Sequence, residues 1–159
     1  TYQNEIKLLY QNEGDGLFSD RSGSMQMDSK ALPYVTFGLK FLDVENDGLL
    51  DLLLANGHVQ DNMEQIDKAL TYRQPLVLLG NVGNRYDDLT PSAFIDLGPI
   101  VGRGLATGDY DNDGRVDILV VDMEGEPLLL HNETQKAGNY LRVALVGTGK
   151  SNRSAYGAI

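Results

Sequence analysis

Short apolar runs separated by turn-forming residues dominate this chain. Each run is only a few residues long and is bounded by Asn, Gly, Asp or Pro, as in β-strands that are buried on both faces. The clearest runs are Asp51–Ala55, Leu76–Leu79, Asp117–Val121 and Pro127–Leu130. Several short strands at close spacing predict an all-β chain that forms a sandwich, a barrel or a propeller.

Two elements of this pattern repeat. Residues 37–54 recur as residues 103–120, with the Gly, the Leu, four acidic positions and the apolar run in register. Leu8–Gly16 resembles Leu78–Asn84, and a weaker copy is Leu128–Glu133. An aromatic residue and then acids follow the first two copies, as Phe18-Ser19-Asp20 and Tyr86-Asp87-Asp88.

A unit that repeats at the spacing between residues 37–54 and residues 103–120 favours a β-propeller, whose blades are four-stranded sheets. The fold we predict is a partial propeller of two to three blades with calcium-binding loops. Its blade units are expected at about residues 1–20, 37–90 and 102–133, with outer strands of the first at Ile6–Tyr10 and Leu17–Asp20. Residues 59–74 are polar, with Met63, Ile66 and Leu70 at helical spacing, and predict an inserted loop with one or two helical turns.

Acidic residues alternate along two of the predicted loops. In the second copy Asp109, Asp111, Asp113 and Asp117 take positions 1, 3, 5 and 9 of a calcium-type loop, with Gly114 at its sharp turn. In the first copy the equivalent residues are Asp43, Glu45, Asp47 and Asp51, with Gly48 at the turn. The main-chain carbonyls of Leu49 and Arg115 can each add one more oxygen ligand.

Calcium accounts for this pattern because it prefers several hard oxygen ligands, and because clustered carboxylates repel one another without a cation. We expect two Ca²⁺ ions, one in each loop, with the longer Glu45 making the first site looser. The EF-hand is excluded because its bidentate Glu is replaced by Leu54 and Val120, which lie in predicted strands.

Composition narrows the possible partners. The chain has 159 residues and a formal net charge of −10, so nucleic acid and anionic membranes are poor partners. It has no Cys, which excludes disulfides and thiolate metal sites. No apolar run approaches the roughly 20 residues that span a bilayer, so we expect no direct membrane insertion.

No catalytic motif stands out. His58 and His131 lack an accompanying nucleophile in the sequence, and His131 occupies a position that repeats as Gln11 and Gly80. A glycosidase carboxylate pair is conceivable, but calcium ligation explains eight of the acids better. We therefore expect no enzymatic activity in this chain.

The spacing Gly-x-x-x-x-Asp-x-Asp/Glu-x-Asp-Gly-x-x-Asp-Leu/Ile, present twice, resembles the FG-GAP/VCBS repeats. The pair Phe37-Gly38 fits the repeat, whereas the second copy has Arg103-Gly104. This resemblance covers about residues 2–133 and implies a β-propeller with structural calcium and an interaction function, located outside the cell, at its surface or in the periplasm.

The tail resembles a second family. Residues 138–148, followed by Lys150-Ser151-Asn152-Arg153 and Gly157-Ala158, look like the start of an ASPIC/UnbV domain, as in cartilage acidic protein-like proteins. We accordingly divide the chain into propeller blades at residues 1–135 and an ASPIC/UnbV-like β domain that starts within residues 136–159. The alternation of Leu141, Val143 and Leu145 predicts a strand that needs a partner.

The function expected from these features is a calcium-binding module for binding or assembly. Its partners would be an unidentified protein or glycan ligand, and further propeller blades or another subunit. Two alternatives stay open: a non-catalytic propeller part of a larger carbohydrate-active enzyme, and an adhesion receptor head.

Overall fold

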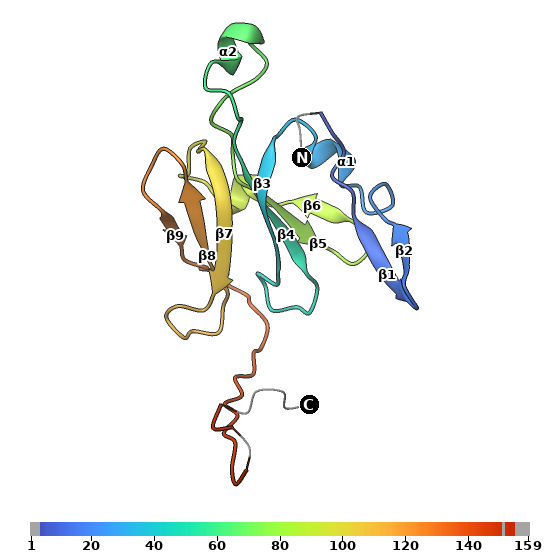
Figure 1. Ribbon diagram of the computed structural model, residues 1–159, viewed down its shortest axis with the longest axis vertical. Coiled ribbons are helices and arrows are strands. Elements are labelled where there is room, and N and C mark those ends of the chain that lie inside the picture. Colours follow the sequence, from blue (N-terminus) through green and yellow to red (C-terminus); the bar gives the residue numbers. More distant parts are fainter. Residues whose placement is uncertain (1–3, 151, 155–159) are drawn as a thin grey trace.

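Three antiparallel sheets side by side make up the body of the chain in a computed structural model that describes residues 4–150 and 152–154 (Figure 1). The first sheet pairs β1 (Tyr10–Gly14) with β2 (Leu17–Asp20). The second has the order β3 (Thr36–Leu42), β4 (Asp51–Asn56), β5 (Val77–Asn81), β6 (Tyr86–Asp88). The third has the order β7 (Gly102–Gly108), β8 (Asp117–Asp122), β9 (Leu128–Leu130).

The all-β prediction is confirmed, and none of the three sheets closes on itself. The helices in the described residues are single turns, namely α1 (Asp28–Ala31), α2 (Met63–Ile66) and α3 (Thr90–Ala93). Of these, α2 lies in the insertion at residues 59–74, which projects from one end of the sheets (Figure 1). None of the helices in the described part of the chain is long and apolar enough to cross a bilayer.

Two predicted strands differ from the structure. The first strand is predicted at Ile6–Tyr10, but β1 spans Tyr10–Gly14. The strand pairing forms only where β2 lies opposite, from the pair of Tyr10 with Asp20 to the pair of Gly14 with Leu17. The strand predicted around Leu141–Leu145 is not formed, since no strand of the described residues lies beside this tail. Alternating apolar residues favour a strand, but a strand also needs a partner edge.

Strand alternation builds two apolar layers from β4. Leu53 points to one face and packs with Leu78, Ile118 and Val120 between the second and third sheets. Leu52 and Leu54 point to the other face and join a cluster that also holds Val77, Leu79, Tyr86, Met27 and Ala31. Because both of its faces are covered, β4 is buried along its whole length, as its continuous apolar sequence predicts.

The second and third sheets approach closely where β3 meets β7. A Cβ added at Gly38 would lie 3.1 Å from the main-chain oxygen of Arg103 and 3.1 Å from Cγ of Leu105. Next to this contact, the guanidinium carbon of Arg103 lies 4.1 Å from the centre of the Phe37 ring. The close contact brings the loop after β3 near the loop after β7.

Candidate metal centre

The two acidic loops lie at the same end of neighbouring sheets. The first loop, residues 43–51, joins β3 to β4, and the second loop, residues 109–117, joins β7 to β8 (Figure 1). The side-chain amide of Asn46 donates to the carbonyl of Gly114 at 3.0 Å. The amide of Asn132 donates to the carbonyl of Val44 at 2.9 Å. These hydrogen bonds link the second sheet's loop to the third sheet.

Both loops turn in the same way. Each has an Asn and then a Gly in the left-handed region: φ is 53° at Asn46 and 89° at Gly48, and 66° at Asn112 and 86° at Gly114. Asn and Gly tolerate this conformation better than other residues. The predicted sharp turn at each Gly is therefore present in the structure.

The first acid of each loop folds the loop around its own carboxylate. In the first loop Asp43 accepts hydrogen bonds from the main-chain N–H groups of Asp47 at 3.0 Å and Gly48 at 2.9 Å. In the second loop Asp109 accepts from Asp113 at 3.0 Å and Gly114 at 3.1 Å. The matching contacts show that the two loops share one local structure.

The last acid of each loop is buried and ties the loop to a third strand. Asp51 is 2% exposed and accepts from the N–H groups of Val44 at 2.9 Å and Asn81 at 2.8 Å. Asp117 is also 2% exposed and accepts from Tyr110 at 3.1 Å and Asn132 at 2.9 Å. The sequence analysis gave Asn81 and Asn132 no role at the acidic loops, although the Asn repeats at the same place in each copy of this element.

The carboxylates converge more closely in the second loop than in the first. Asp109, Asp111 and Asp113 each offer an oxygen within 4.8 Å of the others, and Asp111 and Asp117 do so together with a nitrogen of His131. Among the described residues, Asp43, Glu45, Asp47 and Asp51 form no group at this spacing. The side chains of the second loop are thus closer to the spacing that a cation would need.

The sequence analysis set His131 aside as a catalytic residue and did not place it beside the acidic loop. Its Nδ1 lies 3.1 Å from Oδ1 of Asp117 and 3.7 Å from Oδ2 of Asp111, and its ring packs edge-on against Tyr110. The equivalent position in the second sheet is Gly80, because Asn81 and Asn132 make the same contact to their buried Asp. The two loops therefore differ by one imidazole beside the carboxylates.

The side chain of Arg115 also interacts within the second loop, in addition to the main-chain carbonyl that was predicted as a ligand. Its guanidinium forms an ion pair with Asp113, and its main-chain N–H donates to Oδ1 of Asp113 at 2.8 Å. Its Nε also donates to the carbonyl of Asn132 at 2.6 Å. One carboxylate of the second loop is therefore balanced by a side chain of the same loop.

Electrostatic repulsion acts in the first loop. Burial raises the pKa of Glu45 above its usual range, and the nearby carboxylates of Asp51, Asp47 and Asp43 raise it further. Burial also raises the pKa of Asp51, although its hydrogen bonds from Asn81 and Val44 act in the opposite direction. A bound cation would relieve both causes, since it offsets desolvation and like charge together.

Carboxylate and carbonyl oxygens are the ligands that calcium and similar hard cations prefer. The residues present fit such an ion: Asp109, Asp111, Asp113 and Asp117 with the Arg115 carbonyl, and Asp43, Glu45, Asp47 and Asp51 with the Leu49 carbonyl.

A comparison with protein-family models finds no match for this chain, and a comparison with curated proteins also finds none.

Proposed function

We propose that this chain is a calcium-stabilised part of a β-propeller that serves in binding or assembly outside the cytoplasm and has no catalytic activity of its own. One observation carries the proposal. The same acidic loop occurs at the same place in two neighbouring sheets, and in each a buried Asp connects it to the third strand. The sequence resemblance to FG-GAP/VCBS repeats supports the same proposal.

Calcium would act on the architecture through these loops. Each loop joins two strands, and its last Asp accepts from the N–H of Asn81 at the end of β5 or of Asn132 just after β9. An ion held by the alternating carboxylates would screen their repulsion and fix three strands of a sheet at one end. The net charge of −10 favours a cation and disfavours nucleic acid as a partner.

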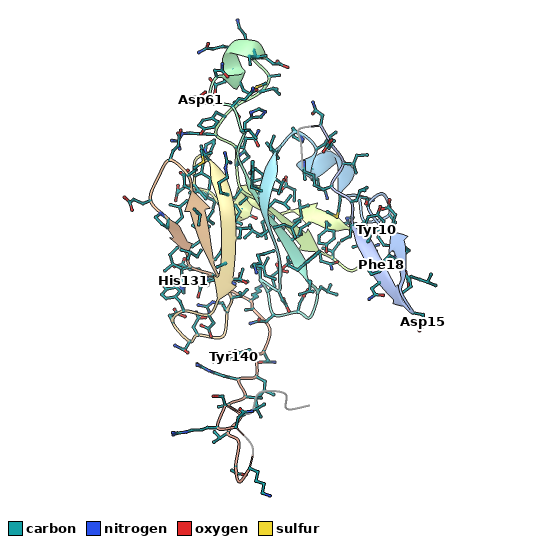
Figure 2. The ribbon with its side chains drawn as sticks, in the orientation of Figure 1. Tyr10, Asp15, Phe18, Asp61, His131 and Tyr140 are labelled. Atoms are coloured by element: carbon teal, nitrogen blue, oxygen red, sulfur yellow. The ribbon has the colours of Figure 1, made fainter. Side chains whose placement is uncertain are left out.

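Calorimetric titration of calcium into chelator-treated protein tests the proposal. We expect two binding events with dissociation constants at or below about 10⁻⁴–10⁻³ M. Asp113→Ala should remove one event and Asp47→Ala the other, because each substitution deletes a ligand from one loop. Asp61→Ala is the matched control, because Asp61 lies in the insertion at the opposite end of the molecule (Figure 2).

Thermal unfolding separates a structural ion from an incidental one. At about ten times its dissociation constant each ion should add roughly 1.4 kcal/mol to the free energy of unfolding. The melting temperature should therefore rise with calcium and fall with chelator in the parent chain, and the shift should shrink in Asp113→Ala. A melting curve that is the same in calcium and in chelator would rule out the structural role.

A further inference from the structure

The first sheet is a partial copy of the second. The hairpin β1–β2 pairs in the same register as β5–β6, with Tyr10 opposite Asp20 where Leu79 is opposite Asp88, and Asn12 opposite Phe18 where Asn81 is opposite Tyr86. The Asn turns also agree. Asn12 accepts from the N–H of Gly14 at 2.9 Å, and Asn81 accepts from Gly83 at 2.9 Å.

The turn after each hairpin confirms the equivalence. The N–H of Leu9 donates to Oγ of Ser22 at 2.8 Å, and the N–H of Leu78 donates to Oγ1 of Thr90 at 3.0 Å. The carbonyls of Leu9 and Leu78 accept from the main-chain N–H groups of Arg21 at 2.8 Å and Leu89 at 2.9 Å. Leu9 is thus the counterpart of Leu78, and Asn12 the counterpart of Asn81 and Asn132.

The first sheet differs from the second and third sheets at one strand edge. In the second sheet β4 lies along β5, and in the third sheet β8 lies along β9, whereas β1 has only β2 beside it among the described residues. Leu9 directs its N–H and C=O towards β2, so strand alternation directs those of Leu8, Tyr10 and Asn12 to the opposite edge. That edge corresponds to the one where Asn81 and Asn132 donate to a buried Asp.

The exposed fractions of the side chains on β1 and β2 are those expected where a neighbouring strand is missing. Tyr10 is 55% exposed, whereas its counterpart Leu79 is fully buried. Phe18 is 63% exposed, whereas its counterpart Tyr86 is 3% exposed. Figure 2 shows Tyr10 and Phe18 on the outlying hairpin. An unpaired edge with large apolar side chains is a surface on which proteins add a further strand.

We propose that the open edge of β1 takes an antiparallel strand of the β4 type, which is an Asp followed by three aliphatic residues. The two occupied edges define this partner, as Asp51-Leu52-Leu53-Leu54 opposite β5 and Asp117-Ile118-Leu119-Val120 opposite β9. Its carboxylate accepts from the N–H of Asn12, and its aliphatic residues lie opposite Tyr10, Leu9 and Leu8. The inference deepens the propeller proposal and rests on it.

The connectivity of the other sheets identifies the source of this strand. In both of them the Asp-bearing strand comes just before the strand it pairs with, as β4 before β5 and β8 before β9. The partner of β1 is therefore a repeat unit of the same polypeptide placed before β1. A second copy of the chain that pairs edge to edge is the competing occupant.

A tandem chain tests the inference. In this chain a copy of residues 36–72 is placed directly before Asn4. Asn4 is the counterpart of Arg73, so the added copy of β3–β4 precedes β1 just as the original β3–β4 precedes β5. Amide hydrogen exchange is followed by NMR at Tyr10 and Asn12 in both the parent and the tandem chain. We expect exchange at these two amides to be slower by about tenfold or more in the tandem chain, with light scattering showing a monomer.

A matched tandem chain carries Asp51→Ala in the added copy alone. It should lose the protection at Asn12 while the protection at Tyr10 persists, because the substitution removes the carboxylate that accepts from Asn12, whereas Tyr10 pairs with the main chain of the added strand. Each of the following results overturns the inference: unchanged exchange at both amides, an added copy that stays unfolded beside the folded chain, or a parent dimer in which β1 is already protected.

The comparison is made both in calcium and in chelator. Slow exchange at Tyr10 and Asn12 in either buffer supports the added strand even where calorimetry finds no calcium. Calcium binding without a change at these amides supports the metal sites alone. The failure of one proposal is therefore distinguishable from the failure of the other.

Discussion

A buried carboxylate is costly unless hydrogen bonds satisfy it, and Asp51 meets this condition with two main-chain N–H groups. These donors belong to Val44 in the first loop and Asn81 on β5. Asp47 on the same loop is exposed and accepts only from the nearby N–H of Leu49 at 2.8 Å. The two acids therefore contribute differently to folding, although both are proposed calcium ligands.

Substitution should separate these two contributions. Asp51→Ala leaves two partly buried N–H groups without acceptors, and we expect a loss of about 2–4 kcal/mol in the free energy of unfolding, measured by urea denaturation in chelator. Asp47→Ala should cost less than about 1 kcal/mol under the same conditions, because its loop remains open to water. Both variants should weaken calcium binding. Equal losses of stability would contradict this division.

The pH dependence of calcium binding follows from the first loop. The pKa values of Glu45 and Asp51 are raised, so protons occupy these carboxylates at a higher pH than they occupy ordinary ones. Their ionised forms destabilise the folded chain above the folded-state pKa, and this penalty is relieved as the pH falls through it. Calcium binds the ionised forms, so protons compete with it in the same range.

We therefore expect the calcium affinity of Asp113→Ala, which retains only the first site, to fall as the pH is lowered from neutral into the range in which Glu45 and Asp51 take up protons. Calorimetry at several pH values measures the effect. Glu45→Gln in the same background should bind more weakly but with a flatter pH dependence, since one of the competing carboxylates is gone. An affinity that stays constant across this range would contradict the assignment.

At the scale of the elements, the loops have the same structure because the same residue types stand at the same turns. Gly48 has a φ of 89°, and no atom lies within 4 Å of an added Cβ, so only the backbone conformation disfavours a side chain there. Gly98 has equal space around it without a left-handed φ. This pair isolates the effect of conformation from that of crowding.

Gly48→Ala should lower the free energy of unfolding by about 1–2 kcal/mol, the cost of a left-handed residue with a Cβ. Gly98→Ala should be neutral or slightly stabilising, because it restricts the unfolded chain at no cost to the fold. Thermal unfolding of the two variants provides the comparison. If Gly98→Ala were the more harmful of the two, the turn would not be the determining feature.

At the scale of the whole molecule, the packing of sheet on sheet depends on Gly38. It lies on β3 where the main chain of β7 comes within 3.1 Å of an added Cβ. Its counterpart in the repeat, Gly104 on β7, would place a Cβ no closer than 3.6 Å, against the side chain of Val121. The same sequence position therefore faces the main chain of a packed sheet in one copy and a side chain at ordinary van der Waals distance in the other.

Gly38→Val should push the second and third sheets apart and cost about 1–3 kcal/mol or more in the free energy of unfolding. Gly104→Val should cost less, because an added Cβ there makes only ordinary van der Waals contact with Val121 and a β-branched side chain suits a half-buried strand. Chemical denaturation of both variants measures the difference. Similar losses in the two variants would mean that intrinsic strand effects, and not sheet packing, explain them.

Much of the local structure follows from the order of residues alone. The run Asp51–Ala55 and its counterpart Asp117–Val121 form β4 and β8 because a short apolar segment between turns is stable as a strand buried on both faces. The loop turns follow from Asn46, Gly48, Asn112 and Gly114, whose conformations are local. The repeat also placed the two acidic loops in equivalent positions.

Contacts between distant segments decided the rest. Nothing near His131 in the sequence indicates that its ring lies beside Asp117 and Asp111, because β9 brings it there across β8. The extent of β1 depends on where β2 lies opposite it, and the tail around Leu141 forms no strand because none of the described strands lies beside it. The sequence by itself determined the buried strands, the turns and the acidic loops, since these depend on neighbouring residues. Only the tertiary structure decided which carboxylates converge and which edge stays open, because both depend on how the sheets pack.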